Sequence, residues 1–415
     1  MEIKLKYGRS SVKFNLNEKN YMDTILPNSI HFDLINDAEV IRAIQNPIGS
    51  KRLKDIVNPG ESIVIVTSDI SRPMPSYRVL PHVIAELKQG GIIKEDITIV
   101  LALGTHRGHT ENEKKALIGD EIFNSGIKVI DSDINRCIRL GTCKNGTPVD
   151  IFEPVVNADR RICLGNIEYH YFAGYSGGNK ALMPGVSSLE AIQKNHSHLV
   201  HPEARAGNLD TNPVRQDIDE VSDFISIDFI VNVILNEKKQ IIKAVAGHNK
   251  EAHRAGCLVL DKIYKRPLEK QADIVVFSPG GYPKDINLYQ SHKSLENIKH
   301  TVRDGGIIIW CASSAEGFGQ KVFEEWLINK KPKEIIADIK DRFILGAHKA
   351  ASIAMVLERA KIFMVSDLPD DLVRSIHLMP FASLQEAVDE AIRQMGENSK
   401  VLVLPEAGSV MPALI

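Results

Sequence analysis

Short apolar runs alternate with helical patterns along most of the chain. Residues 62–68 (SIVIVTS) and 97–103 (ITIVLAL) are mainly apolar runs with the length of a buried strand. Between them, apolar side chains recur at the spacing of one helix face, at Tyr77, Leu80, Val83, Ile84 and Leu87. This strand–helix–strand order predicts an α/β fold with mostly parallel sheets flanked by helices.

Two segments before residue 250 are predicted to be hairpins. Residues 1–16 alternate polar and apolar positions around a turn at 7–11, and the run at 224–235 is followed by a matching run at 240–245. Further elements are expected as follows: a helix at 111–117, strands at 127–130 and 161–164, and a helix at 249–264.

A second α/β pattern occupies the last third of the chain. Residues 273–281 (DIVVFSPGG) and 306–314 (GIIIWCASS) have the composition of buried strands that end in small residues, with a helix expected at 291–302. A strongly amphipathic helix is expected at 383–395, followed by a last strand at 400–404.

These patterns predict two domains, since 415 residues exceed what one hydrophobic core usually supports. An N-terminal α/β domain is expected over 1–268 and a C-terminal α/β domain over 269–397. A return of 398–415 to the first domain stays open. In parallel sheets of this kind, functional loops follow the carboxyl ends of the strands.

Composition excludes several classes of protein. A net charge of −2 with 25% charged residues gives no electrostatic basis for binding nucleic acid or an acidic membrane. Five cysteines without a CxxC pair indicate reduced thiols in a cytoplasmic protein. The N-terminus lacks the apolar core of a signal peptide, and the longest apolar run, at 97–103, is too short to cross a bilayer.

Residues 168–201 carry the densest group of reactive side chains. His170 is followed by a glycine turn, by Lys180 and by three histidines, His196, His198 and His201. Gly177 and Gly178 stand just before Lys180, where a loop of small residues lets backbone N–H groups approach an anion. A core histidine and a surface lysine are the alternatives for the individual residues, but their joint occurrence favours an active site that anchors a phosphorylated or covalent cofactor.

Polar groups also follow predicted strands and open a predicted helix. Asp69 and Arg72 follow the strand at 62–68, and His106 follows the strand at 97–103. An arginine fork suits a carboxylate, and histidines suit acid–base chemistry, although a capping Asp, a surface Arg and a structural His are the alternatives. A further group stands at a helix start in the C-terminal domain: Tyr289, Gln290 and Lys293. The residue types suggest acid–base chemistry on a small carboxylate substrate.

These segments resemble the nickel-dependent lactate racemase family, which uses a nickel-pincer cofactor on 2-hydroxy acids. The similarity runs in the same order across most of the chain, through SDISRP (68–73), ALGTHR (102–107), YHYFAGYSGGNKALMPG (169–185), NH (195–196) and LYQSHKS (288–294). It implies two α/β domains with the active site in the cleft between them, and a racemase or epimerase activity.

The resemblance also implies roles for single residues. Lys180 falls on the lysine that is covalently attached to the cofactor, nickel pyridinium-3,5-bisthiocarboxylic acid mononucleotide, and His196 falls on the histidine that completes nickel coordination. His106 and His170 fall on the paired catalytic histidines. The remaining positions are Gly177, Gly178 and Asp69 on the cofactor side, and Arg72, Tyr289, Gln290 and Lys293 on the substrate side.

The implied reaction is a proton-coupled hydride transfer through a bound 2-keto acid, with the cofactor supplied by separate biosynthesis proteins. A tryptophan that well-known lactate racemases place near the cofactor has no counterpart after Trp326. Two alternatives stay open: His348 or a neighbour on the helix around 346–357 occupies that space, or nothing aromatic does. A sugar-acid (aldonate) epimerase and a nickel- or cofactor-binding protein without turnover are the alternatives. A nicotinamide dehydrogenase is disfavoured, because no GxGxxG motif follows the first predicted strand of an α/β unit.

Overall fold

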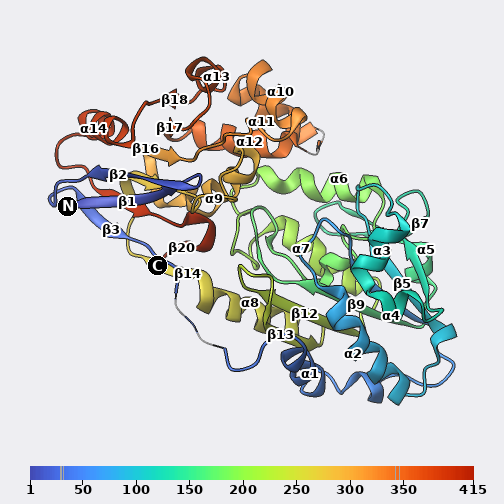
Figure 1. Ribbon diagram of the computed structural model, residues 1–415. Coiled ribbons are helices and arrows are strands. Elements are labelled where there is room, and N and C mark those ends of the chain that lie inside the picture. Colours follow the sequence, from blue (N-terminus) through green and yellow to red (C-terminus); the bar gives the residue numbers. More distant parts are fainter. Residues whose placement is uncertain (29, 31, 342, 345) are drawn as a thin grey trace. The chain divides into compact units, whose positions relative to one another are not determined.

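The protein is described by a computed structural model covering residues 1–415 except 29, 31, 342 and 345. The chain forms two compact units (Figure 1). One, the central unit, is Ile30–Leu260, and the other, the terminal unit, combines Met1–Ser29 with Asp261–Ile415. Each unit contains its own six-stranded sheet, in the order β13-β12-β9-β4-β5-β6 and β18-β17-β16-β15-β19-β3. The α/β class expected from the sequence is confirmed.

The sheet of the central unit is parallel except for its edge strand. β12 and β13 pair antiparallel, and all other neighbours pair parallel. Its apolar strands lie in the core because their side chains are covered on both faces. The strands are β4 (Ile63–Ser68), β5 (Ile97–Ala102), β6 (Lys128–Asp131), β9 (Arg160–Asn166), β12 (Phe229–Leu235) and β13 (Ile241–Gly247).

Helices of the central unit pack on this sheet through apolar faces. In α2, Val79, Leu80, Val83 and Leu87 are fully buried, whereas Tyr77, expected on the same face, is 47% exposed. The helices are α1 (Asp37–Gln45), α2 (Ser76–Gln89), α3 (Glu111–Ile118), α4 (Asp120–Phe123), α5 (Glu153–Val156), α6 (Leu189–Ser197), α7 (Pro213–Glu220) and α8 (Glu251–Tyr264). Two small hairpins complete the unit: β7 (Cys137–Thr142) with β8 (Pro148–Phe152), and β10 (Tyr169–His170) with β11 (Gly174–Tyr175).

The order of the strands places a topological switch point between β4 and β9. The chain proceeds from β4 to β5 and β6 on one side, and β9 then pairs with β4 on the other side. In open α/β sheets a crevice forms at such a point, outside the carboxyl ends of the two strands. A ligand site is therefore expected where β4 and β9 end.

The sheet of the terminal unit is parallel throughout. Its strands are β3 (Tyr21–Thr24), β15 (Ala272–Phe277), β16 (Val302–Cys311), β17 (Lys361–Val365), β18 (Met379–Pro380) and β19 (Val401–Leu404). Its helices are α9 (Leu288–Ile298), α10 (Lys321–Asn329), α11 (Pro332–Asp341), α12 (Ala347–Leu357), α13 (Asp370–Ser375) and α14 (Leu384–Met395). The unit also contains the hairpin β1 (Glu2–Tyr7) with β2 (Ser10–Asn15), and the parallel pair β14 (Lys265–Leu268) with β20 (Met411–Leu414).

One segment lies in a different unit from the one expected, and the place of a second, which the sequence left open, is now determined. The first 29 residues, expected in the N-terminal domain, belong to the terminal unit, where β3 pairs with β19. β19 itself lies between β15 and β3 in the terminal sheet, so 398–415 does not return to the first domain. All four residues of β19 are buried, as an interior strand requires. A local polar–apolar pattern predicts a strand but does not specify which sheet it joins.

The other expected strands and helices are confirmed, with shifts of up to five residues at their ends, the largest at the start of β12 (expected at 224, observed at 229). One shift bears on the predicted site: α9 was expected at 291–302 and begins at Leu288. The Asn287 side chain accepts a hydrogen bond from the Gln290 N–H group (2.9 Å) and so caps the helix. This earlier start places Tyr289 and Gln290 in the first helical turn. No helix formed by the described residues has the length and apolar content needed to span a bilayer.

Candidate active site

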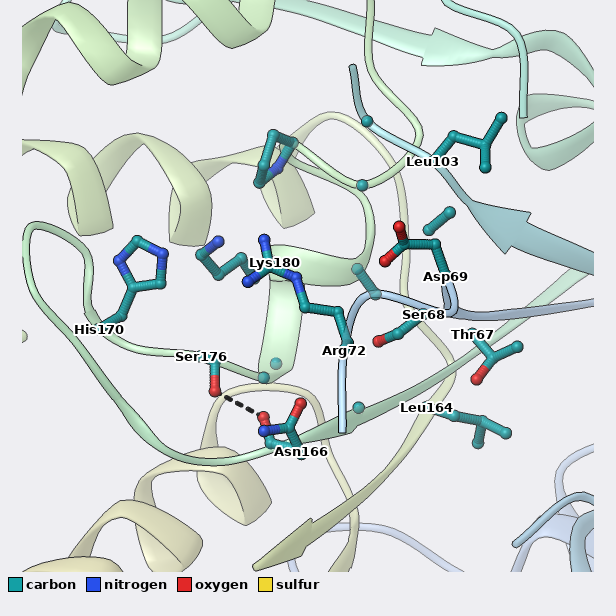
Figure 2. Close-up of a pocket in the computed structure, with 18 of the residues that line it drawn as sticks. Thr67, Ser68, Asp69, Arg72, Leu103, Leu164, Asn166, His170, Ser176 and Lys180 are labelled. Atoms are coloured by element: carbon teal, nitrogen blue, oxygen red, sulfur yellow. Dashed lines mark hydrogen bonds between the residues drawn. The ribbon is translucent and has the colours of Figure 1, made fainter. Parts of the chain in front are cut away.

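A pocket lies at the carboxyl ends of β4, β5 and β9, at the switch point of the central sheet (Figure 2). Ser68, Leu103 and Asn166 mark where these three strands reach it. Seven of the predicted site residues line it together: Asp69, Arg72, His106, His170, Gly177, Gly178 and Lys180. Figure 2 shows Lys180 between His170 and the loop that carries Asp69 and Arg72. Residues up to about 110 positions apart in the sequence therefore meet in one cavity.

His106 forms a histidine–carboxylate pair with Asp69. The distance from Nδ1 to Oδ2 is 2.6 Å, and the Ser71 hydroxyl donates to the same carboxylate at 2.9 Å. Burial acts to raise the pKa of Asp69, but the hydrogen bonds from His106 and Ser71 outweigh it and hold the pKa below its ordinary value. A carboxylate only accepts hydrogen bonds, so Nδ1 of His106 carries a proton and Nε2 is the basic atom.

A second histidine, His109, holds the loop that carries Asp69. Its Nδ1 donates to Asp131 at the end of β6 (2.6 Å), and its Nε2 accepts the backbone N–H group of Ile70 (3.1 Å). The His109 side chain is 1% exposed. His109 therefore connects the end of β6 to the loop that carries Asp69 and Arg72 and holds the backbone of that loop in place. Sequence analysis missed this residue, although it stands only three positions after His106 in the same loop.

The neutral His170 ring carries its proton on the other ring nitrogen from that of His106. It belongs to the short strand β10, and its Nδ1 accepts the backbone N–H group of Ala173 (3.2 Å). In the neutral ring the proton is therefore on Nε2, which is then a donor. The ring packs edge-on against Phe172, with centroids 4.6 Å apart. The expectation of a histidine among aromatic side chains and the expectation of a pocket histidine both hold.

Lys180 lies in a single turn of 3-10 helix, Gly178–Ala181, that follows the glycine pair. Burial, and then the charges of Arg72 and Arg215, lower the pKa of its amine to about 7. A large fraction of the amine is therefore neutral and nucleophilic at neutral pH. Gly177 has a φ of 78°, and a Cβ atom there would lie 2.7 Å from the side chain of Asn232. Only glycine fits this turn.

Arg72 supplies a cation to the same pocket. It lies on the exposed loop after β4 and lines the pocket, and its side chain extends toward Lys180 (Figure 2). A guanidinium presents two parallel N–H groups that match a carboxylate. The pocket thus combines a cation for a carboxylate, a proton acceptor on His106, a proton donor on His170 and a neutral amine.

The third predicted histidine, His196, lies next to this group. It belongs to α6, and its ring packs edge-on against Phe172 with centroids 4.9 Å apart. Phe172 in turn contacts His170, so one aromatic ring separates the two histidines. Both ring nitrogens of His196 are buried. This burial is expected for a metal ligand and not for a histidine that only contacts solvent.

His198 and His201 have structural surroundings. Nε2 of His198 lies 3.7 Å from Asp217, and Nδ1 of His201 accepts the N–H group of Glu203 (3.1 Å). Cys143, Asp217 and Glu220 form a group of possible metal ligands. However, their carboxylates accept hydrogen bonds from the tip of the β7–β8 hairpin, from the Thr147 hydroxyl and the Lys144 N–H group. These contacts dock the hairpin on α7.

Tyr289, Gln290 and Lys293 lie at the start of α9 in the terminal unit. Lys349 of α12 holds this helix start, because its ammonium donates to the Tyr289 carbonyl (2.7 Å) and lies 3.5 Å from the centre of the Tyr289 ring. Burial, and then the charge of Lys293, lower the pKa of Lys349 to about 7. Sequence analysis did not single out Lys349. His348, expected near the missing tryptophan, is buried against Phe343 with centroids 5.2 Å apart.

Comparison with known families gives matches to both parts of the chain. The lactate racemase N-terminal domain matches residues 7–207, and the lactate racemase C-terminal domain matches residues 268–412. Together these matches contain every residue named above as a site residue.

Individual proteins are similar over their full length. The lactate racemase of Thermoanaerobacterium thermosaccharolyticum is 35% identical over 422 residues, which cover 99% of this chain and 98% of that protein. The lactate racemase of Lactiplantibacillus plantarum is 31% identical over 423 residues, which cover 99% of each chain.

Solved structures agree. The Thermoanaerobacterium lactate racemase apoprotein superposes with a TM-score of 0.86 at 33% identity and covers 100% of both chains. A protein from Thermotoga maritima has a TM-score of 0.63 at 16% identity, covering 94% of this chain and 100% of that one, which shows a shared fold alone.

Proposed function

Because this chain belongs to the lactate racemase family, we propose that it interconverts the two configurations at C2 of a 2-hydroxy acid, as a racemase or epimerase. The observation that carries the proposal is the pocket in which His106 and His170 present complementary ring nitrogens beside Lys180 and Arg72. Inversion at C2 needs acid–base groups that can act on either face of the same carbon. A protein that only carried a cofactor would need Lys180 but not the His106–Asp69 pair.

The roles of the two histidines follow from their hydrogen bonds. Nε2 of His106 accepts the proton of the substrate hydroxyl group, and Asp69 stabilises the imidazolium that forms. Nε2–H of His170 donates a proton to the oxygen when the hydroxyl group is restored. In the reverse reaction the two rings exchange roles. Asp69 was expected on the cofactor side, and its contacts support a further role in orienting His106.

Arg72 is proposed to bind the substrate carboxylate, with Gln290, Lys293 and Tyr289 of the terminal unit contributing to the same task. The three residues of α9 are assigned by their match to the family motif, and Arg72 is also supported by its position in the pocket. A fixed carboxylate keeps C2 in one place while the hydroxyl proton is transferred.

The residues of the pocket fit the nickel-pincer nucleotide of the family. The lowered pKa of Lys180 suits covalent attachment, the Gly177–Gly178 turn lines the pocket with backbone alone, and His196 has a buried ring suited to nickel. When bound, this cofactor supplies an acceptor for the hydride at C2. Its attachment requires separate biosynthesis proteins, which are the proposed partners.

Lactate and larger 2-hydroxy acids, including aldonates, are the candidate substrates. The tryptophan of well-known lactate racemases has no counterpart after Trp326, so larger acids are candidates beside lactate. The two alternatives differ in the size and polarity of the group attached to C2. A panel of chiral 2-hydroxy acids of increasing size distinguishes them.

The proposal is tested on protein produced together with the cofactor biosynthesis enzymes. Intact mass and nickel analysis should show an added mass on the Lys180 peptide and bound nickel, and one acid of the panel should be racemised. The Lys180→Ala variant should lack the added mass, whereas Lys194→Ala, which removes an exposed lysine of α6, should retain it. A wild-type chain without adduct or nickel would contradict the proposal.

A further inference from the structure

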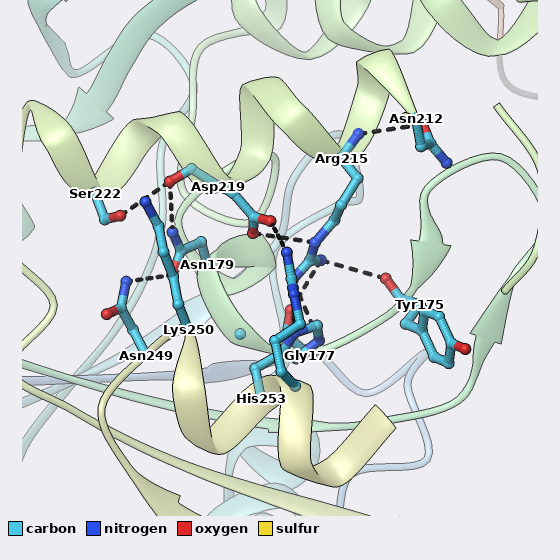
Figure 3. A network of polar contacts seen from close by, with 12 residues as sticks. Tyr175, Gly177, Asn179, Asn212, Arg215, Asp219, Ser222, Asn249, Lys250 and His253 are labelled. Carbon is cyan, nitrogen blue, oxygen red and sulfur yellow. Dashed lines mark hydrogen bonds and ion pairs between the residues drawn. The ribbon is translucent and has the colours of Figure 1, made fainter. Parts of the chain in front are cut away.

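A buried network of polar side chains packs against the turn that carries Lys180 (Figure 3). Its centre is formed by Arg215 of α7 and His253 of α8, which are both 0% exposed. Neither residue lines the pocket surface described above. A fully buried guanidinium is costly unless each of its donors has a partner, so its position needs an explanation.

Most N–H groups of Arg215 contact backbone carbonyl groups of the turn and side chains that pack against it. Its Nη1 lies 3.4 Å from the carbonyl oxygens of Tyr175 and Gly177. Its Nη2 lies 3.0 Å from Nδ1 of His253, and its Nε forms an ion pair with Asp219 at 3.1 Å. The guanidinium therefore links two carbonyl groups of the turn to helices α7 and α8.

His253 completes the contact with the turn. Its Nε2 donates to the Ser176 carbonyl oxygen (2.8 Å), so its Nδ1 is the acceptor for Arg215 and for Arg254 (2.9 Å). Burial, and then the charge of Arg215, hold the pKa of His253 well below its ordinary value. The neutral His253 ring therefore links the guanidinium groups of Arg215 and Arg254 to the backbone of the turn.

Three consecutive carbonyl groups, those of Tyr175, Ser176 and Gly177, thus contact these two side chains. Backbone carbonyl groups in a buried segment need partners. The Gly177 carbonyl also accepts the N–H group of Lys180 (3.3 Å), so Arg215 contacts a carbonyl that is bonded directly to the residue it would position. The fit is close: a Cβ atom on Gly178 would lie 2.9 Å from the His253 ring and 3.0 Å from Nη2 of Arg215. The turn and the network are shaped to each other.

We propose that Arg215 and His253 are positioning residues that fix the turn 175–178 and so present the amine of Lys180 to the pocket for cofactor attachment. This inference deepens the proposed function and rests on it for the role of Lys180 as the attachment point. It adds two residues of α7 and α8 to the machinery that prepares the site.

The charges of the network support this role. Arg215 and Arg254 share one carboxylate, that of Asp219, so the network has an excess positive charge behind the turn. The groups that act on the Lys180 amine are Arg72 and Arg215, which lower its pKa, and Glu168, which acts in the opposite direction. Loss of Arg215 should therefore reduce the neutral fraction of the amine at pH 7.

The test measures the reactivity of the Lys180 amine in the apoprotein, where no cofactor or substrate is needed. Limited acetylation with acetic anhydride is followed by peptide mass spectrometry from pH 6 to 10, with the exposed Lys194 in the same digest correcting for reagent decay. In the wild type the midpoint of Lys180 reactivity should lie near pH 7. Arg215→Met should lower the rate at pH 7 about fivefold, because a rise of about one unit in a pKa near 7 reduces the neutral fraction of the amine from about a half to about a tenth. His253→Leu should lower it by a similar factor, because Arg215 and the Ser176 carbonyl lose their contacts with the ring.

Conservative and control variants separate positioning from general damage. His253→Gln retains an acceptor and a donor and should keep the wild-type pH profile. Arg205→Met and His248→Gln, two exposed residues outside the network, should also leave it unchanged. If Arg215→Met does not fold, the His253→Leu and His253→Gln pair decides the question. Rates within twofold of the wild type in folded His253→Leu protein would overturn the proposal.

A second measurement separates this inference from the proposed function. In cells that produce the cofactor, the fraction of chains with the Lys180 adduct should fall in His253→Leu and be retained in His253→Gln. If the wild type forms no adduct, the proposed function fails, and the acetylation profiles still decide whether the network sets the Lys180 amine. If adducts form equally in all variants, the positioning role is refuted.

Discussion

The two six-stranded sheets have similar topologies but different carboxyl edges. Each has a switch point, between β4 and β9 in the central unit and between β15 and β19 in the terminal unit. At the central switch point, strand-end loops form a pocket with Asp69, Arg72 and Lys180 in its lining. At the terminal edge, the turn of the N-terminal hairpin β1–β2 is bound by the loops that follow β15, β16 and β17.

The polar groups of the terminal edge are engaged in structural hydrogen bonds. The N–H group of Gly8 donates to the buried Asp285 (2.7 Å), the Ser278 hydroxyl donates to the Lys6 carbonyl (2.6 Å), and the Tyr7 hydroxyl donates to Asp367 (2.7 Å). Burial, and then Asp367, raise the pKa of Tyr7, so its hydroxyl stays protonated. These groups hold a segment of the chain where a ligand would otherwise bind.

A switch point therefore provides the position for a ligand site but does not by itself form the site. Both edges carry carboxylates and lysines. In the central unit, His106 keeps a basic nitrogen, and the pKa of Lys180 is lowered to about 7. In the terminal unit, Asp285, Asp367 and Ser278 at the carboxyl edge bind the β1–β2 hairpin. Substitutions should therefore alter catalysis at the first edge and stability at the second.

The largest effect is expected from His106→Gln and His170→Gln, which remove the two histidines proposed as the acid–base groups of the central edge. Each should reduce the rate of racemisation by about 10² to 10⁴-fold, the usual contribution of a positioned acid or base, while cofactor attachment at Lys180 is retained. Chiral chromatography of the product and intact mass measure the two quantities. His201→Gln, which changes a loop histidine, is the control. Activity above a tenth of the wild type would exclude the altered residue as a catalytic group.

A smaller effect is expected from Asp69→Asn, because Asp69 acts through His106. Loss of a charge-assisted hydrogen bond of about 1.5–3 kcal/mol should lower the rate by roughly 10 to 10²-fold. The pKa of Asp69 is held below its ordinary value, so its contribution to stability is full above the ordinary pKa and is lost as the pH falls through the lowered value.

Asp69→Asn should therefore lose less stability on acidification than the wild type. Thermal melting from pH 7 to pH 3 measures this difference, and the racemisation rate measures the effect on His106. An acid dependence equal to that of the wild type, together with a normal rate, would contradict the role assigned to the His106–Asp69 pair.

The sequence was sufficient to predict the groups of the central edge because they follow apolar strands directly. Asp69 and His106 follow strands whose apolar pattern is local, and strand ends of a parallel sheet meet. The glycine turn before Lys180 was recognised from its own composition. Side chains that act from behind the site were missed. His109 reaches Asp131 after 22 residues, and Arg215 reaches His253 after 38 residues. No periodicity encodes such contacts.

The unit to which the hairpin β1–β2 belongs was also beyond local reasoning. Its alternating pattern predicts two paired strands, which the structure has. Its apolar residues Leu5 and Phe14, however, are buried against the terminal sheet and α14, more than 250 positions away in the sequence. The sequence signal that could have indicated the network is an arginine or histidine on the apolar face of an amphipathic helix. Arg215, which stands between Val214 and Ile218, is such a residue.

At the terminal edge, Asp285→Ala should reduce stability and leave the Lys180 amine unchanged. Asp285 accepts N–H groups of Gly8 (2.7 Å) and Ser313 (3.3 Å), and the substitution would leave both without this acceptor. The expected loss is about 1–3 kcal/mol, measured as a lower melting temperature. The exposed Asp304→Ala is the matched control. A normal melting temperature would show that the hairpin is not held by Asp285, and altered acetylation of Lys180 would break the proposed separation of the two edges.

The smallest effect is expected from Lys6→Ala, which removes the ion pair between the hairpin and Glu406 (2.7 Å). The Lys6 side chain is 60% exposed, so water and salt screen the pair and its contribution should be at most about 1 kcal/mol. The melting-temperature difference from the wild type should shrink further in 1 M salt, whereas the Asp285→Ala difference should persist, because that carboxylate is buried. Equal salt dependence of the two variants would mean that surface charge, rather than buried hydrogen bonds, holds the hairpin over the terminal edge.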